Sequence, residues 1–267
     1  MRFGYCLNMT ASGPDGTGIE RVARIAEIGY DYVELPLAEL TALPKEKFQE
    51  VKRELENSGL RCETCNNFFP GTLQLTGPQV DSGRIKNYVE MALGRANELG
   101  VQYLVFGSGK AKNVPEGFSL EDGYRQVVGL LKEVAPAAEK NGITIVIEPL
   151  RKAECNLVNT FEEGCRLAAD VSHPHVKVLV DFYHLSVEKE PVEHLVAMGK
   201  ENLRHVHFAD PVGRVYPEEV KMDYIPFFQA LKEIGYNERI SCEAYVTNFD
   251  AQAERALEFF KKIMLTI

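Results

Sequence analysis

The fold of this chain is decided by one stretch, Thr144-Ile145-Val146-Ile147-Glu148-Pro149-Leu150-Arg151-Lys152-Ala153-Glu154. It begins as a β-branched apolar run that is too short for a helix, which is typical of a strand buried on both faces. Proline cannot donate to a sheet ladder, so the strand ends at Glu148, just before Pro149. Because an unpaired buried carboxylate is costly, an acid at this position indicates a chemical role.

Three later strand-like runs end in the same way, with a residue type that binds metal ions. They are Lys177-Val178-Leu179-Val180-Asp181, Leu203-Arg204-His205-Val206-His207 and Arg239-Ile240-Ser241-Cys242-Glu243. A lone acid at a strand end is most often a helix cap or a surface group. Four strand ends of this kind indicate one shared site.

The composition excludes two broad classes of partner. The chain has 267 residues, of which 45% are hydrophobic and 26% are charged, as in a globular protein with a large core. No apolar run approaches the roughly 18 residues that a membrane span needs, so we expect no membrane partner. The net charge of -9 argues against a broad nucleic-acid surface, and it suits an acidic site that concentrates a divalent cation.

The chain repeats one unit eight times, a short apolar strand followed by an amphipathic helix. The predicted strands are Phe3–Leu7, Tyr32–Glu34, Leu60–Asn66, Gln102–Phe106, Ile143–Glu148, Val176–Asp181, Leu203–His207 and Arg239–Glu243. The predicted helices lie near Gly18–Ile28, Pro44–Ser58, Gly83–Leu99, Leu120–Lys140, Thr160–Ala169, Pro191–Met198, Tyr224–Ile234 and Ala251–Met264. Five helix-to-strand turns carry a glycine that suits a left-handed helix cap, at Gly29, Gly59, Gly100, Gly142 and Gly235.

This alternation predicts an α/β fold, a single (β/α)8 TIM barrel that forms one domain over residues 1–267. Strands that alternate with helices form a parallel sheet with right-handed crossovers, and eight units suit a closed barrel. An open doubly wound sheet is the alternative. The count of eight units and the lack of an interrupting linker favour the barrel.

The barrel brings the four strand ends together. Active sites in this fold lie where the strands meet the following loops. Glu148, Asp181, His207 and Glu243 occupy that place on four consecutive strands, and neighbouring strands are about 4.8 Å apart. We therefore expect the four side chains to converge on one ion. Three carboxylates and one imidazole favour Mn²⁺, Mg²⁺ or Co²⁺, with Zn²⁺ also possible.

These motifs resemble those of the xylose-isomerase-like sugar-phosphate isomerase/epimerase superfamily over nearly the whole chain. The resemblance rests on Ile147-Glu148-Pro149-Leu150, Val180-Asp181-Phe182-Tyr183-His184, His205-Val206-His207-Phe208-Ala209-Asp210, Ser241-Cys242-Glu243 and the helical segment Asp223–Tyr236. Within that superfamily, the spacing of the four candidate ligands is most similar to the ketose 3-epimerases of the tagatose and psicose type.

The resemblance implies roles for seven residues. Glu148, Asp181, His207 and Glu243 would hold one divalent metal, with Mn²⁺ the first choice, and Glu148 and Glu243 would be the catalytic acid and base. Three further residues match substrate-binding positions, namely Glu154, His184 and Arg214, although Arg214 is off by one from the epimerase spacing. The chain has no tryptophan, so Phe68, Phe69, Phe106 or Tyr245 would have to cover the apolar face of a sugar.

The function we expect is that of a divalent-metal-dependent isomerase or epimerase of a small sugar or polyol, working by proton abstraction next to a carbonyl through an enediolate. One alternative is a metal-dependent lyase or dehydratase that resembles inosose dehydratase. Another is a non-enzymatic sugar-binding barrel. An abasic-site endonuclease belongs to the same superfamily, but the acidic balance argues against it. By analogy alone, we expect a homo-oligomer, either a dimer or a tetramer.

The cysteines indicate a reduced, cytoplasmic protein. Six cysteines show no spacing of a secreted disulfide scaffold, and the N-terminus lacks the apolar region of a signal peptide. Cys62-Glu63-Thr64-Cys65 is a lone CxxC on a predicted strand. Alternation along a strand predicts that its two thiols point to opposite faces, as small core residues.

Four other features remain open at this stage. Glu34 ends the second strand as Glu148 ends the fifth, and it suits either substrate contact or a capping or packing role. His205 lies two residues before His207 on the same face, which favours interior packing over a fifth ligand. Gly107-Ser108-Gly109-Lys110 suits either a tight turn or an anion cradle. Phe68-Phe69-Pro70-Gly71 suits the edge of a lid.

Overall fold

The computed structural model describes residues 1–267 as a closed barrel of eight parallel strands. The strands are β1 (Arg2–Cys6), β2 (Tyr32–Pro36), β3 (Cys62–Asn66), β4 (Tyr103–Phe106), β5 (Thr144–Ile147), β6 (Val176–Asp181), β7 (Leu203–Phe208) and β8 (Arg239–Cys242). Each strand pairs with its neighbours in chain order, and β8 closes the barrel on β1. The predicted (β/α)8 barrel is confirmed.

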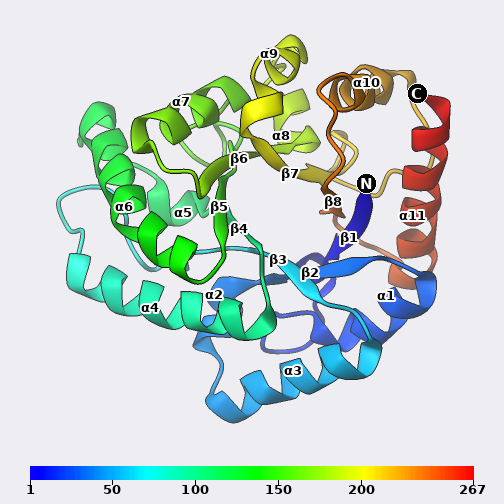
Figure 1. Ribbon diagram of the computed structural model, residues 1–267, viewed down its shortest axis with the longest axis horizontal. Helices are drawn as coiled ribbons and strands as arrows, with labels where there is room; N and C mark the ends of the chain where they lie inside the picture. The colour runs from blue at the N-terminus through cyan, green and yellow to red at the C-terminus, as the bar shows by residue number, and fades with distance from the viewer.

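Helices surround the strands as an outer ring (Figure 1). The eight long ones are α1 (Val22–Ile28), α3 (Lys45–Ser58), α4 (Ser82–Leu99), α6 (Leu120–Lys140), α7 (Phe161–Val171), α9 (Glu193–Asn202), α10 (Ile225–Glu233) and α11 (Phe249–Thr266). All five glycines predicted in helix-to-strand turns have positive φ, which explains why these turns need glycine. No helix is both long enough and apolar enough to cross a membrane.

Three short helices and two 3-10 turns were not predicted, and a third 3-10 turn, η2 (Ile19–Arg21), lies inside the helix predicted near Gly18–Ile28. The elements that were not predicted are α2 (Leu37–Ala42), α5 (Gly109–Lys112), α8 (Phe182–Val187), η1 (Leu7–Thr10) and η3 (Met222–Tyr224). None exceeds six residues, so none displays the helical period on which sequence reasoning depends. The helices α2 and α8 directly follow strands, and α5 begins three residues after the end of β4, so all three lie at the carboxyl ends of strands (Figure 1).

The predicted orientation of the two thiols in the CxxC sequence is wrong. Cys62 and Cys65 are buried core residues, as expected, but their sulfur atoms lie 3.8 Å apart. The cause is an irregularity in the pairing of β2 with β3, where Val33 pairs with Cys62 and Glu34 with Thr64. Glu63 is therefore an extra residue on β3, and a bulge of this kind interrupts the alternation of faces.

Candidate functional site

Four buried side chains converge at the carboxyl ends of β5 to β8. They are the four predicted ligands, Glu148, Asp181, His207 and Glu243, and one ligand atom from each lies within 4.8 Å of all the others. Glu148 and Glu243 each come one residue after their strand. Their backbone N–H groups still donate to the preceding strand, to the carbonyls of Phe106 and Phe208. Hydrogen bonds to the sheet therefore fix the backbone positions of the two glutamates.

Each ligand atom has a defined partner. His207 Nδ1 lies 3.3 Å from Glu148 Oε1 and 3.1 Å from Glu243 Oε2. Asp181 caps α8 with Oδ1, which accepts a hydrogen bond from the Tyr183 N–H at 2.9 Å. Its other oxygen, Oδ2, is the one that lies near the cluster. One oxygen of each glutamate thus faces the histidine, and the second oxygen of Glu243 accepts from Asn66 Nδ2 at 3.4 Å.

The pKa values in the site reflect several buried carboxylates that lie close to Arg214 and His207. Burial raises the pKa of Asp181 to about 7, although Arg214 opposes that shift. Burial alone would also raise the pKa of Glu243, but Arg214 and His207 outweigh it and lower the pKa to about 2. Burial disfavours the charged form of His207, yet Glu34 and Glu243 raise its pKa well above the usual value. The cluster therefore attracts positive charge strongly.

This donor set fits a divalent cation. Three carboxylates and one imidazole, all buried and converging, form the oxygen-rich site that Mn²⁺, Mg²⁺ or Co²⁺ prefers. His207 Nδ1 faces two carboxylate oxygens, and a cation between these atoms would remove their mutual repulsion.

Arg214 lies at the edge of the cluster. Its Nη2 is 2.5 Å from Glu243 Oε2 and 3.3 Å from Asp181 Oδ2, and its guanidinium stacks 4.9 Å from the centre of the Tyr183 ring. The backbone of Arg214 has φ of 51°, in the left-handed region, so the loop after β7 holds this residue in a conformation that costs free energy. Arg214 Nε is buried without a partner, which leaves a donor available.

Glu154 and His184, the other predicted substrate contacts, lie beside each other. Glu154 Oε1 is paired with Arg151 Nε at 2.7 Å, and its Oε2 lies 4.0 Å from His184 Nε2. The Arg151 backbone N–H donates to His184 Nδ1 at 3.2 Å, so the hydrogen of the neutral ring is on Nε2. That N–H is buried without a hydrogen-bond partner, 3.5 Å from Asp181 Oδ2. An unpaired buried donor beside the cluster can bind a substrate oxygen.

Three further residues shape the site through contacts that were not predicted. Asn66, at the end of β3, donates its amide to Glu243 Oε1 at 3.4 Å, and its own Oδ1 has no partner. Lys112 is fully buried and donates to the backbone carbonyl of Glu148 at 3.1 Å. Gly107 leaves room for Glu148, because a Cβ there would lie 2.2 Å from Glu148 Oε2. Each acts on a residue that is distant in the sequence, and sequence spacing does not reveal such contacts.

Three of the open sequence features are resolved by the structure. Ser108 precedes α5 with φ of 40°, so Gly109 and Lys110 begin a short helix, and the Ser108 hydroxyl accepts from the Phe69 N–H at 3.0 Å. Phe68 and Phe69 are buried core residues, so they do not form an exposed lid edge. His205 is fully buried inside the barrel, in agreement with interior packing. The side chain of Tyr245, one of the aromatic residues considered for the apolar face of a sugar, is 58% exposed.

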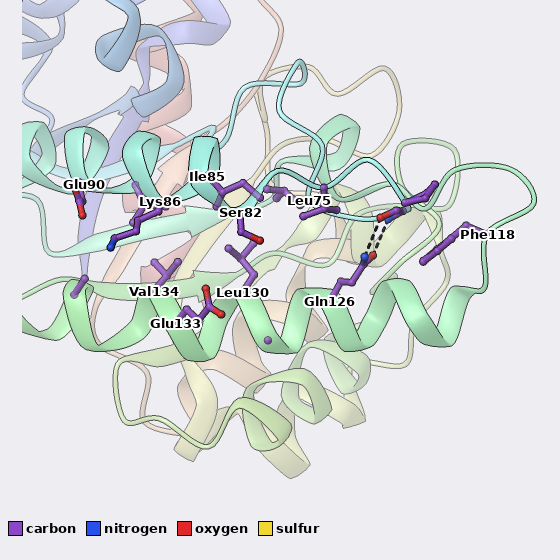
Figure 2. Close-up of a pocket in the computed structure, with 16 residues that line it drawn as sticks. Leu75, Ser82, Ile85, Lys86, Glu90, Phe118, Gln126, Leu130, Glu133 and Val134 are labelled. Carbon is purple, nitrogen blue, oxygen red and sulfur yellow. Dashed lines mark hydrogen bonds between the residues drawn. The ribbon is translucent and has the colours of Figure 1, made fainter.

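A cavity lies outside this cluster. It has a volume of about 720 Å³ and lies between α4 and α6, with Ile85 and Lys86 on one wall and Leu130 and Val134 on the other (Figure 2). Gln126 closes one part of it through two hydrogen bonds to the backbone of Gly77. None of the residues that line it belongs to the acidic cluster, so we attach no chemistry to it.

Comparisons with known proteins agree with this fold. The family described as Xylose isomerase-like TIM barrel matches residues 22–263. L-ribulose 3-epimerase of Methylomonas sp. (strain DH-1) is 29% identical over 229 residues, which are 84% of this chain and 77% of that protein. The 3-dehydro-D-guloside 4-epimerase of Escherichia coli (strain K12) is 24% identical over 246 residues, 89% of this chain and 91% of that one.

Solved structures show the same fold. A D-psicose 3-epimerase crystallised in the presence of D-fructose superimposes with a TM-score of 0.86 at 18% identity, over 99% of both chains. At this level of identity the likeness concerns the fold. The predicted resemblance to the xylose-isomerase-like superfamily and its ketose 3-epimerases is confirmed.

Proposed function

The chain belongs to the xylose isomerase-like TIM barrel family, and from this premise we propose that it is a divalent-metal-dependent epimerase or isomerase of a small sugar or polyol. One observation carries the proposal. Glu148 and Glu243 converge on one point from different strands, and each directs only one carboxylate oxygen at His207. Two carboxylates in this arrangement suit removal of a proton from one face of a carbon and return from the other.

Glu148, Asp181, His207 and Glu243 would hold the ion. Bound there, it would act as a Lewis acid that stabilises negative charge developing on a substrate oxygen. The remaining chemistry belongs to the chain. One of the two glutamates removes the proton beside the carbonyl, which leaves an enediolate, and the other returns a proton to the opposite face. The low pKa of Glu243, about 2, keeps that carboxyl ionised near neutral pH, as a base must be.

Three side chains would orient the substrate. The unpaired Nε2–H of His184 can donate to a sugar oxygen, and the buried, unpaired Nε of Arg214 can do the same. Glu154 is held by Arg151, and its second oxygen can accept from a hydroxyl. Buried polar groups without partners favour binding of a substrate that forms hydrogen bonds with them. A substrate that leaves them unpaired binds less tightly.

Within this function we propose ketose 3-epimerase chemistry. The support is the pattern of relatives, which include an L-ribulose 3-epimerase and a D-psicose 3-epimerase, together with the spacing of the four candidate ligands. The identities of 24% and 29% leave the choice of sugar to the loops that surround the site.

Dehydration of a related polyol ketone is less well supported. It requires an acid that protonates a leaving hydroxyl, and the candidates are His184 and Glu154. Burial lowers the pKa of His184 to about 3, so its ring is neutral near pH 7 and is a poor acid. One carboxylate oxygen of Glu154 is already paired with Arg151 Nε at 2.7 Å.

The test is product analysis on a panel of ketoses and inososes with Mn²⁺ added. We expect an epimer or isomer of unchanged mass, no product after chelation, and recovery when Mn²⁺ is restored. A product lighter by one water would instead establish dehydration. Bound Mn²⁺ with no turnover of any of these compounds would contradict the proposal and favour a binding role.

A further inference from the structure

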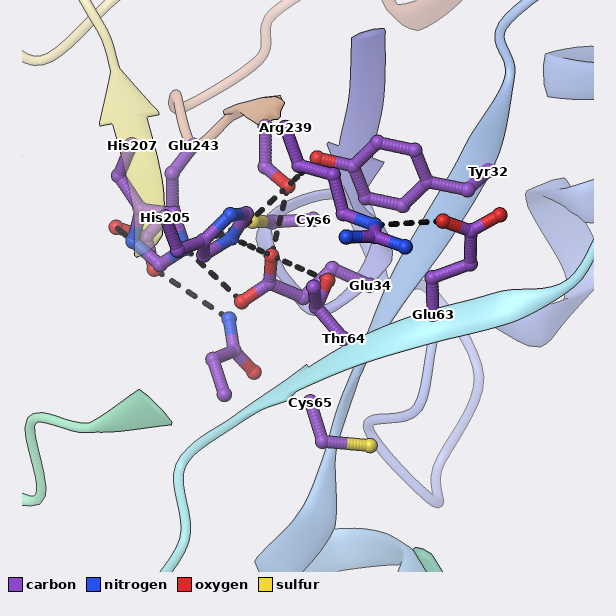
Figure 3. Close-up of polar contacts among 12 residues, drawn as sticks. Cys6, Tyr32, Glu34, Glu63, Thr64, Cys65, His205, His207, Arg239 and Glu243 are labelled. Carbon is purple, nitrogen blue, oxygen red and sulfur yellow. Dashed lines mark hydrogen bonds and ion pairs between the residues drawn. The ribbon is translucent and has the colours of Figure 1, made fainter. Parts of the chain in front are cut away.

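A second polar cluster lies inside the barrel, directly beside the acidic one (Figure 3). Its centre is Glu34 on β2, which is fully buried. A buried carboxylate is costly unless its charge is satisfied, and this one is satisfied entirely by side chains from other strands. Glu34 caps no helix, and no part of it is exposed to contact a substrate.

The two oxygens of Glu34 have different partners. Oε1 lies 2.9 Å from His207 Nε2. Oε2 lies 2.8 Å from His205 Nε2, 2.8 Å from Thr64 Oγ1 and 2.7 Å from Ser241 Oγ. The three contacts to Oε2 prevent rotation of the carboxylate, so Oε1 stays directed at His207.

His207 therefore has a carboxylate at each side of its ring. Nδ1 faces Glu148 and Glu243 in the acidic cluster, and Nε2 faces Glu34. The other neighbour of Nε2 is the Cys6 sulfur at 4.0 Å, which is a much weaker acceptor than a carboxylate oxygen at 2.9 Å. Carboxylates therefore flank both ring nitrogens, and Glu34 is the strong acceptor on the Nε2 side.

We propose that Glu34 is a positioning residue that keeps the hydrogen of His207 on Nε2, so that the lone pair of Nδ1 is presented to the divalent ion. This inference rests on the proposed metal centre and adds a residue to it. An ionised carboxylate accepts hydrogen bonds and cannot donate one, so Nε2 must be the donor and Nδ1 the ligand atom. A carboxylate behind a ligating imidazole also raises its basicity and fixes the ring orientation.

The substitution Glu34→Gln would remove this control over the ring hydrogen. The glutamine amide has the shape of the carboxylate but can offer an N–H as well as a carbonyl oxygen. An N–H directed at Nε2 would stabilise the ring with its hydrogen on Nδ1, where it blocks the ion. The chain offers a matched control in Glu63, also buried, which is paired with Arg239 Nε at 2.6 Å and Arg2 Nη1 at 2.6 Å and touches no histidine.

The first test observes the ring directly in the unmodified protein. Histidine is labelled with ¹⁵N, the protein is loaded with diamagnetic Zn²⁺, and long-range ¹H–¹⁵N spectra assign the hydrogen. We expect His207 to carry its hydrogen on Nε2 and to bind Zn²⁺ through Nδ1. A hydrogen on Nδ1, with Nε2 deprotonated, would overturn the inference while leaving metal binding intact. If wild-type protein binds neither Zn²⁺ nor Mn²⁺, the metal centre and this inference fall together.

The second test compares Glu34→Gln with Glu63→Gln by Mn²⁺ titration against a competing chelator. We expect Glu34→Gln to weaken Mn²⁺ binding by about 10- to 100-fold, the usual effect of losing such a partner. Glu63→Gln should leave Mn²⁺ affinity unchanged even if it lowers thermal stability. Equal Mn²⁺ affinity in wild type and Glu34→Gln would refute the positioning role. If Glu34→Gln does not fold, the tautomer measured in the wild-type protein decides the question.

Discussion

Asp181 on β6 and His207 on β7 are direct partners in the sheet register. His207 is in turn the register partner of Ser241 on β8, two residues before Glu243. The side chains of residues two apart on a strand point to the same face, so Glu243 continues the interior face of β8 at the mouth of the barrel. The register therefore sets Asp181 and His207 side by side, and Glu243 lies on the same interior face two residues nearer the carboxyl end of β8.

If Asp181 supplies charge to the ion, Asp181→Asn should lower Mn²⁺ affinity on the order of 100-fold, because an amide keeps the shape and loses the charge. Metal content by elemental analysis after dialysis at limiting Mn²⁺ measures this. The control is Asp170→Asn, which changes an exposed acid on α7 that bonds the Tyr124 hydroxyl. Unchanged metal content in Asp181→Asn would rule out the proposed site.

Glu243→Gln separates catalysis from metal binding. The amide oxygen can still approach the ion, but it cannot accept a proton, so kcat at saturating Mn²⁺ should fall by about 10²- to 10⁴-fold. The comparison is activity per bound Mn²⁺, determined for wild type and variant in parallel. A loss of activity that only follows the loss of metal would show that Glu243 is a ligand and not a base.

Gly107→Ala should disturb the site by a steric clash, without a change of charge. The added Cβ would lie 2.2 Å from Glu148 Oε2, so the carboxylate must move, and we expect a loss of about 1–3 kcal/mol in stability together with weaker Mn²⁺ binding. Gly129→Ala is the matched control, since a Cβ there meets no atom within 4 Å in the middle of α6. That change should be neutral or stabilising by up to about 1 kcal/mol. Thermal melts and Mn²⁺ titrations of both variants test the contrast.

Mn²⁺ should stabilise the folded protein, because the unfolded chain has no such site. At a free concentration of 100 times Kd the gain is about 2.7 kcal/mol, which raises Tm by about 5–10 °C in a chain of this size. Differential scanning fluorimetry with and without a chelator measures the shift. Asp181→Asn should show little of it at the same Mn²⁺ concentration, and an equal shift in that variant would place the binding elsewhere.

The barrel and the four convergent residues could be predicted because the signals are local. Each buried strand is a short β-branched run, several helix ends carry glycine, and the acid at position 148 stands before Pro149. The role of Glu34 could not be predicted, because it depends on which side chains meet across the barrel interior. The prediction that the Cys62 and Cys65 thiols point to opposite faces failed for a related reason, because the bulge at Glu63 depends on how β3 pairs with β2.

The central claim is that two carboxylates exchange a proton with the carbon beside a carbonyl. The most direct test incubates the Mn²⁺-loaded protein in D₂O with each ketose of the panel and locates deuterium by NMR and mass spectrometry. Because different carboxylates remove and return the proton, we predict that deuterium enters the product at the carbon beside the carbonyl, with the carbon skeleton unchanged. Turnover without deuterium at that carbon, or bound Mn²⁺ without any exchange, would contradict the account.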